Sequence, residues 1–112
     1  MHTYNLNVTT FVVSFIRVRY MEFEWDEAKN QSNIRKNGVG FERAKTIFYG
    51  PTKVLKEEIT LDGKVRELTI GILDGLITLA VVNTDRNGKI RIISARKATR
   101  YEQKTFEASL RS

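Results

Sequence analysis

The side chains of this chain that are best suited to chemistry are its lysines and arginines. Seven of them fall within residues 83–104 against two carboxylates, so this stretch carries +5 of the formal net charge of +6. They are Arg86, Lys89, Arg91, Arg96, Lys97, Arg100 and Lys104. Such clustering is typical of a surface that binds phosphates. A solvated face that only keeps the protein soluble is the alternative.

Composition excludes several other kinds of site. Without Cys, the chain has no disulfide, thiolate metal site or cysteine nucleophile, and its single His at position 2 excludes His-rich metal sites and a Ser-His-Asp triad. Nothing resembles a P-loop, a dinucleotide-binding fingerprint, a zinc-protease motif or an EF-hand. Charges on edge strands usually serve solubility. An acid–base pair or a Mg²⁺ site remains an alternative for four neighbouring carboxylates, Glu57, Glu58, Asp62 and Glu67.

The elements that must position the basic side chains begin with a short strand and two helices. Alternation over Glu22–Trp25 indicates an edge strand. Asp26 is a suitable N-cap for a helix from Glu27 to about Lys36, which Asn37-Gly38 ends. A second short helix is expected from Phe41 to about Tyr49.

Four strands and a closing helix follow. The pairs Asp62-Gly63, Asp74-Gly75 and Asn87-Gly88 indicate hairpin turns and therefore an antiparallel meander. The strands are predicted over Lys53–Thr60, Val65–Ile72, Ile77–Thr84 and Lys89–Ala95. The closing helix is predicted from Ala98 to about Leu110, with Tyr101, Thr105 and Phe106 on its buried side. The prediction is an α+β domain with helices covering one face of the meander.

The alternation of side chains along a strand predicts on which face of the sheet each arginine lies. It puts Arg91 on one face of the last strand and Arg96 on the other. Arg66, near the start of the second meander strand, is expected beside Arg86 or Arg96. Guanidinium groups that converge on a concave sheet hold a phosphodiester and stabilise the charge that develops during its cleavage. The alternative for each arginine is an exposed ion pair with a nearby carboxylate.

Residues 1–20 differ in composition from the rest of the chain, with Arg17 and Arg19 as their only charges. We interpret them as an N-terminal extension, of the kind that an upstream start codon would add. An added strand over Thr9–Arg19 is the alternative. Residues 21–112 are predicted to form a single domain. No stretch approaches the roughly 20 apolar residues that span a bilayer, so no membrane association and a cytoplasmic location are expected.

Four motifs, in the right order, resemble those of the BrnT toxins of bacterial type II toxin–antitoxin systems. Residues 23–29, F-E-W-D-E-A-K, resemble the family's F-E-W-D-x-x-K. Residues 33–44, N-I-R-K-N-G-V-G-F-E-R-A, resemble N-x-x-K-H-G-V-x-F-E-E-A. Residues 66–71, R-E-L-T-I-G, resemble R-x-x-x-I-G, and residues 91–98, R-I-I-S-A-R-K-A, resemble R-I-I-S-A-R-x-A. The first 20 residues lie outside the resemblance.

The resemblance implies a RelE-like fold and a ribonuclease that inhibits translation by cleaving RNA. It also implies a cognate ribbon-helix-helix (BrnA-like) antitoxin, which neutralises the toxin and contacts operator DNA on behalf of the complex. No metal or other cofactor is implied. The candidate catalytic residues are Lys36, as a base or electrostatic partner, and Arg66, Arg86 and Arg96, as phosphate-binding groups. The further RNA-binding candidates are Lys89, Arg91, Lys97, Arg100 and Tyr101, and Glu102 is a weaker catalytic candidate beside Tyr101.

Two departures from the family pattern keep other functions open. Asn37 stands where the motif has His, and Asn83 stands where relatives often carry His. A catalytically degenerate toxin that only holds its antitoxin in a repressor complex is one alternative, and a non-catalytic nucleic-acid-binding module is another. Trp25 and Phe41 are interpreted as core residues, and Asn33 as a brace between the first helix and the sheet.

Overall fold

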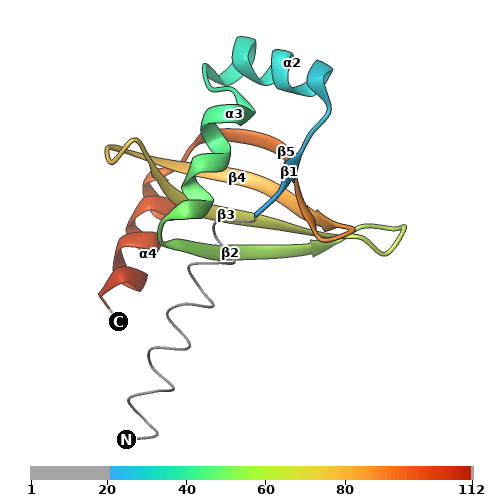
Figure 1. The fold of residues 1–112 in the computed structure, drawn as a ribbon. Helices are drawn as coiled ribbons and strands as arrows, with labels where there is room; N and C mark the ends of the chain where they lie inside the picture. Colours follow the sequence, from blue (N-terminus) through green and yellow to red (C-terminus); the bar gives the residue numbers. More distant parts are fainter. Residues whose placement is uncertain (1–20, 112) are drawn as a thin grey trace, which may run out of the picture.

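The computed structural model describes residues 21–111, which form a five-stranded sheet flanked by helices (Figure 1). In chain order the elements are β1 (Phe23–Glu24), α2 (Glu27–Asn37), α3 (Phe41–Ala44), the 3-10 helix η1 (Lys45–Tyr49), β2 (Thr52–Ile59), β3 (Val65–Leu73), β4 (Ile77–Arg86), β5 (Lys89–Lys97) and α4 (Arg100–Leu110). The strand order across the sheet is β1-β5-β4-β3-β2. The predicted α+β order of elements is confirmed. The expected extension over residues 1–20 lies outside the described residues.

Three tight turns build the antiparallel meander of β2 to β5. Asp74 and Gly75 both have positive φ angles, 53° and 70°, as do Asn87 and Gly88, 55° and 82°. Two consecutive positive φ angles match the right-handed twist of the flanking strands, and Asn-Gly and Asp-Gly adopt them most readily. The β2–β3 connection is longer and has Gly63 at φ 82°. The turn residues therefore confirm the predicted meander.

The first strand closes one edge of the sheet. β1 pairs parallel with β5, with Phe23 opposite Ile90 and Glu24 opposite Arg91. The alternation over Glu22–Trp25 predicted an edge strand, which is confirmed. Its parallel partner lies more than 60 residues further along the chain, and no local pattern identified it.

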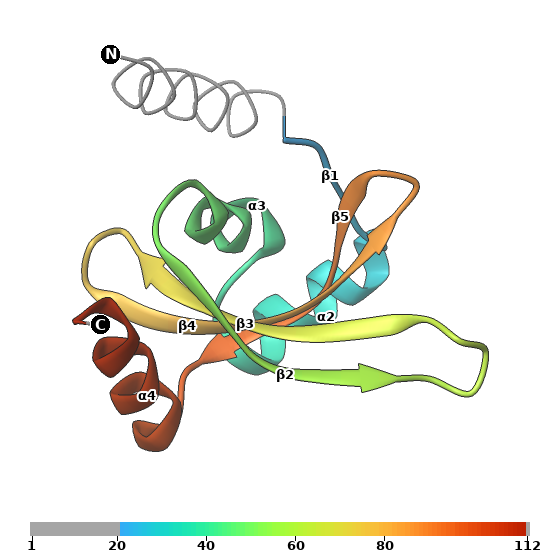
Figure 2. The same ribbon diagram turned by 90° about the horizontal axis from the view of Figure 1, so that it is seen from below.

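Helices cover both faces of the sheet, which corrects the expectation that they cover one. On one face, α3 and η1 pack on a cluster of buried residues, Val39, Phe41, Ala44, Ile47, Leu73, Leu79, Val81, Ile92 and Ala95. On the other face, α4 packs on a smaller cluster, Ile70, Ala80 and Phe106. Figure 2 shows α3 and α4 on opposite sides of the sheet. The central strands are apolar at successive positions, so both of their faces need cover.

Two aromatic residues of the sequence motifs serve the core, as predicted. Phe41 is fully buried, and Trp25 packs against the same cluster. Their rings meet edge to face with centroids 6.1 Å apart. None of the helices within residues 21–111 has both the length and the apolar character needed to span a membrane.

The closing helix buries Phe106 as predicted, but the prediction that Tyr101 is buried is wrong. Tyr101 is 73% exposed and Thr105 is half-buried, whereas Glu102 and Phe106 are buried. The cause is the helix start, because Thr99 and Glu102 form a capping box in which each side chain accepts a hydrogen bond from the other's backbone N–H. This cap directs Glu102 inward, and Phe106, one turn later, follows it.

A β-bulge interrupts the alternation of β5. Val82 pairs with Ser94, but the next residue of β4, Asn83, pairs with Ile92, so Ile93 has no partner. One extra residue in a strand shifts every side chain beyond it to the opposite face.

The bulge corrects the predicted faces of β5. Ile92 and Ala95 both belong to the cluster under α3, although strict alternation places them on opposite faces. The same shift places Arg91 and Arg96 together on the other face of the sheet, away from Ile92 and Ala95. The two guanidinium groups that the sequence pattern separated therefore share one surface.

Candidate active site

Three adjoining hollows lie on the face of the sheet that carries Arg91 and Arg96. The helix hollow, about 320 Å³ between α2 and β5, is lined by Lys29, Ser32, Asn33, Lys36, Asn37, Ser94 and Arg96. The central hollow, about 220 Å³ over the middle of the sheet, is lined by Lys56, Glu58, Arg66, Glu67, Leu68, Val82 and Arg96. The hairpin hollow, about 280 Å³ beside the β4–β5 hairpin, is lined by Lys29, Lys64, Arg66, Thr84, Asp85, Arg86, Arg91 and Ile93.

Shared side chains join the three hollows into one surface. Arg96 lines both the helix hollow and the central hollow, and Arg66 lines both the central hollow and the hairpin hollow. Lys29 lines both the helix hollow and the hairpin hollow. Eight of the lining residues are cationic against three carboxylates, so the connected surface carries a net positive charge.

The strand register explains why these side chains meet. Arg66, Thr84 and Arg91 are cross-strand neighbours on β3, β4 and β5. The backbones of the two arginines are therefore two strand spacings apart, about 10 Å. The next row on the same face is Leu68, Val82 and Ser94, and it lies two residues further along each of β3 and β4. This row of small and apolar side chains forms the floor between the cations.

Arg96 is held in place by α4. Its two terminal nitrogens donate to the two carboxylate oxygens of Glu102 at 2.7 and 2.9 Å, and Glu102 also accepts from the backbone N–H of Thr99 at 2.8 Å. The Arg96 hydrogen bonds, with those of Thr99, lower the pKa of Glu102 to about 2, and the same pair raises the pKa of Arg96. The Arg96 side chain is still 41% exposed. The hydrogen bonds of Arg96 within residues 21–111 come from its two terminal nitrogens and leave its Nε–H without an acceptor there.

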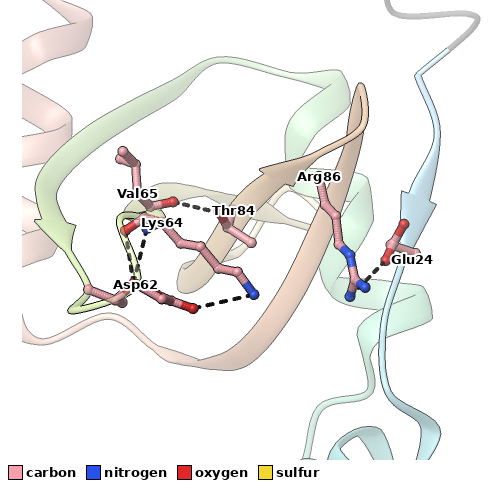
Figure 3. Close-up of polar contacts among 7 residues, drawn as sticks. Glu24, Asp62, Lys64, Val65, Thr84 and Arg86 are labelled. Carbon is pink, nitrogen blue, oxygen red and sulfur yellow. Dashed lines mark hydrogen bonds and ion pairs between the residues drawn. The ribbon is translucent and has the colours of Figure 1, made fainter.

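A carboxylate at the sheet edge pairs with two of the three arginines of the hairpin hollow. Glu24 of β1 accepts a hydrogen bond from Arg91 at 2.7 Å and lies 3.9 Å from the guanidinium of Arg86. Figure 3 shows Arg86 reaching Glu24 from the end of β4, while Lys64 extends from the β2–β3 turn, where it pairs with Asp62. These ion pairs leave more than half of the Arg86 side chain exposed.

A buried amide joins α2 to β5. Asn33 donates to the carbonyl oxygens of Ala95 and Val39, both at 2.8 Å, and accepts from the backbone N–H of Ala95 at 3.2 Å. Its side chain therefore pairs with the edge of β5 as a neighbouring strand would. The predicted brace is confirmed, and it brings Lys29 and Lys36 to the helix hollow.

Four cations of this surface have no carboxylate partner in the described part of the chain. Within residues 21–111, no carboxylate oxygen lies within 4.0 Å of the charged nitrogens of Lys29, Lys36, Lys56 or Arg66. Unpaired cations that surround a hollow favour an anionic ligand such as a phosphodiester.

Comparison with known proteins identifies the family of the chain. A family model described as "Ribonuclease toxin, BrnT, of type II toxin-antitoxin system" matches residues 25–102. The chain belongs to this family. The crystal structure of the Brucella abortus ribonuclease toxin BrnT is 31% identical and matches with a TM-score of 0.56, covering 71% of this chain and 99% of that one. No curated protein sequence matches the chain significantly.

Membership in the BrnT family confirms the resemblance stated from the four motifs. It makes this chain a ribonuclease toxin of a type II toxin–antitoxin system, with RNA as substrate and an antitoxin as partner. The match begins at Trp25 and so leaves the first 24 residues unmatched.

The four predicted catalytic residues lie on the connected surface. Lys36 and Arg96 share the helix hollow, Arg66 and Arg96 share the central hollow, and Arg86 shares the hairpin hollow with Arg66. Lys36 and Arg86 share no hollow.

The predicted RNA-binding residues are more widely spread. Arg91 lines the hairpin hollow, and Lys89, near it on the hairpin, pairs with Glu22 at 3.6 Å. Lys97 lines a separate depression beside the β3–β4 turn, and Arg100 and Tyr101 are exposed on the first turn of α4. Their part in RNA binding remains a prediction.

Sequence reasoning missed three cations of the surface, Lys29, Lys56 and Lys64. A signal existed for Lys29, which shares a helix face with Asn33 and Lys36. None existed for Lys56, because a bulge between Val54 and Lys56 sets its face.

The asparagines that replace His occupy different environments. Asn37 lines the helix hollow and donates to the side-chain oxygen of Asn33 at 3.0 Å. Asn83 is buried, accepts from the hydroxyl of Thr69 at 2.8 Å and lines none of the three hollows. Within residues 21–111, no three His, Cys, Asp or Glu side chains gather as metal ligands.

Proposed function

We propose that this BrnT toxin cleaves RNA without a metal ion where the helix hollow and the central hollow meet, with Lys36, Arg66 and Arg96 around the reacting phosphodiester. The observation that carries the proposal is the position of Arg96, which lines both hollows and has Lys36 on one side and Arg66 on the other. Arg86 shares only the hairpin hollow with Arg66, so we assign it to phosphate binding away from the reacting atoms.

The reaction has three requirements. The ribose 2′-oxygen loses its proton and attacks phosphorus, charge accumulates on the nonbridging oxygens, and the bond to the 5′-oxygen breaks as that oxygen gains a proton. The products are a 2′,3′-cyclic phosphate and a 5′-hydroxyl end. Lys36 serves the 2′-oxygen as base or electrostatic partner, and Arg66 and Arg96 donate hydrogen bonds to the charged oxygens.

Preorganised guanidinium groups supply the charge stabilisation that a metal ion would otherwise provide. Arg96 suits this role because Glu102 already fixes its orientation, so little reorganisation accompanies the reaction. Cleavage in excess EDTA at the rate seen without EDTA is the expected result. Loss of cleavage in EDTA and its recovery with Mg²⁺ would refute metal independence.

Substitution tests the site. Arg66→Gln, Arg96→Gln and Lys36→Gln are each expected to lower the rate of RNA cleavage about 100-fold or more, the usual effect of removing one oxyanion donor. Arg43→Gln is the matched control, because Arg43 pairs with Asp74 at the β3–β4 turn, away from the three hollows. A 2′-deoxy substitution at the cleaved nucleotide removes the nucleophile and should stop the reaction. Equal rates for the Arg66, Arg96 and Arg43 variants would refute the site.

A degenerate toxin that acts with its antitoxin as a co-repressor is the second candidate. It is favoured by Asn37, which lies in the helix hollow where the family motif has His. The free wild-type protein would then leave RNA intact, Asn37→His would restore cleavage, and the complex with antitoxin would still bind operator DNA. Cleavage by the wild-type protein selects the first candidate, and RNA binding without cleavage by either protein indicates a non-catalytic binding module.

We also propose that the cognate antitoxin is a ribbon-helix-helix (BrnA-like) protein and that the toxin acts in the cytoplasm, contacting operator DNA only through that partner. The antitoxin of a cationic site is expected to place carboxylates over it. Co-expression should restore growth that the toxin alone arrests, and the complex should shift operator DNA that the toxin alone does not shift. A rescuing antitoxin of another fold would contradict the partner class.

A further inference from the structure

The hairpin hollow is a second cationic site beside the proposed reaction centre. Its lining includes five cationic side chains and one carboxylate, Asp85. Glu24 offsets part of that charge through Arg91 and Arg86. The hollow is therefore still positively charged overall, and its 280 Å³ exceeds the 220 Å³ of the central hollow.

Two side chains of the hairpin hollow are held in place by hydrogen bonds to the rest of the fold. The hydrogen bond from Arg91 to Glu24 ties its deepest guanidinium to β1, and that side chain is only 26% exposed. Thr84, between Arg91 and Arg66, donates its hydroxyl to the carbonyl oxygen of Val65 at 2.5 Å. A ligand would therefore meet two groups, Arg91 and Thr84, whose orientation is already fixed, which reduces the entropy lost on binding.

The hairpin hollow and the central hollow lie over neighbouring rows of the sheet. The row that contains Thr84 lies two residues along β4 from the row that contains Val82, about 7 Å. That is close to the separation of successive phosphates in an extended RNA strand. Arg66 lines both hollows, so one guanidinium can contact both phosphates.

We propose that the hairpin hollow is a subsite for the phosphodiester next to the one that is cleaved, so that the toxin requires single-stranded RNA of at least three nucleotides for efficient cleavage. The proposal rests on the proposed function for the identity of the reacting linkage. Arg91, Arg86 and Lys29 contact the neighbouring phosphate, and Ile93 gives the sugar an apolar surface. This subsite explains why cations away from the reaction centre face the same surface.

Short chimeric substrates test the subsite. Each contains one ribonucleotide, and so one cleavable linkage, at a sequence that the wild-type toxin cuts. A dinucleotide is compared with trinucleotides extended by one deoxynucleotide on the 5′ or the 3′ side. The extension on one side is expected to raise kcat/KM roughly tenfold, the value of one charge-assisted hydrogen bond. No gain from either extension overturns the proposal.

Substitutions in the hairpin hollow test whether the gain in kcat/KM from the third nucleotide arises there. In Arg91→Gln the ratio of trinucleotide to dinucleotide kcat/KM should fall towards one. Arg86→Gln should lower the same ratio and provides a second variant in case loss of the bond to Glu24 loosens β1. Lys104→Gln, an exposed cation of α4 that lines none of the three hollows, should keep the wild-type ratio. A gain that persists in both arginine variants overturns the proposal.

Binding separates the subsite from the chemistry. Affinity is measured for uncleavable 2′-O-methyl dinucleotides and trinucleotides over a range of salt concentrations. Loss of one phosphate contact reduces the slope of log affinity against log salt by about 0.7 for single strands. Arg91→Gln should show this reduction with the trinucleotide and not with the dinucleotide. The same reduction with both lengths, or with neither, overturns the subsite even if the protein cleaves no RNA at all.

Discussion

Glu102→Gln is expected to lower the free energy of unfolding of the toxin by more than the loss of an exposed carboxylate would. Glu102 is buried, accepts two hydrogen bonds from Arg96 and one from the backbone N–H of Thr99, and completes the cap of α4. An amide keeps the shape of the side chain but loses the charge that these donors stabilise. The guanidinium of Arg96 then has a neutral partner, so its orientation towards both hollows relaxes and RNA cleavage should fall as well.

The lowered pKa of Glu102 sets the size of the effect. The carboxyl titrates at about 2 in the folded protein against 4.5 as its ordinary value. That difference corresponds to about 3 kcal/mol of folding free energy. Exposure of Arg96 to solvent reduces the measurable value to about 2 kcal/mol. Because the folded pKa is the lower one, this stability is fully present above pH 4.5 and is lost as the pH falls towards 2.

Urea unfolding of the wild-type protein and Glu102→Gln at pH 7 and pH 3 measures this directly. The difference between the two proteins should be about 2 kcal/mol at pH 7 and less than half of that at pH 3. Glu107→Gln is the control, because Glu107 is exposed on the same helix and accepts from Gln103. A difference of equal size at both pH values would refute the electrostatic reasoning, since a purely steric defect does not titrate.

Three further changes test the packing that positions the site, each by urea unfolding. Asn33→Ala removes three hydrogen bonds to buried backbone groups and leaves those of Ala95 unsatisfied, so a loss of about 3 kcal/mol is expected; a loss below 1 kcal/mol would mean that α2 does not depend on this amide. Gly71→Ala would place a Cβ 2.8 Å from the Cβ of Ile47 and should cost about 1–3 kcal/mol, whereas an unchanged midpoint would show that η1 moves freely away from β3. Phe106→Ala empties the core under α4 and should cost about 3–5 kcal/mol; a smaller cost would mean that the helix resettles on the sheet.

The elements of this fold were predictable because local chemistry fixes their ends. Asp26 and Gly38 bound α2 through a side-chain cap and a left-handed residue, and both have local sequence signals. The turns Asp74-Gly75 and Asn87-Gly88 adopt the backbone angles that their residue types favour. Helix and strand positions therefore agree with the sequence to within a few residues.

The faces of the elements were harder to predict, because they depend on distant contacts. The bulge at Ile93 carries no distinctive residue type, yet it decides that Arg91 and Arg96 share a surface. The buried side of α4 follows from the capping box of Thr99 and Glu102 together with the bidentate pair between Glu102 and Arg96, and the second of these involves a residue outside the helix. The four candidate catalytic residues lie on one connected surface, but their distribution over three hollows required the tertiary structure, and their catalytic role remains a prediction.

The contacts of Asn33 have a consequence for the angular position of α2. Its amide bonds to Ala95 fix the rotation of the helix about its own axis, and Lys29 and Lys36 lie one turn to either side. Each residue of an α-helix advances by about 100°. One alanine inserted between Asn33 and Lys36 would leave the helix hydrogen bonded to the strand yet turn the Lys36 ammonium by about that angle, out of the helix hollow. Spacing along this helix, rather than the presence of lysine alone, therefore determines whether an ammonium group faces the helix hollow.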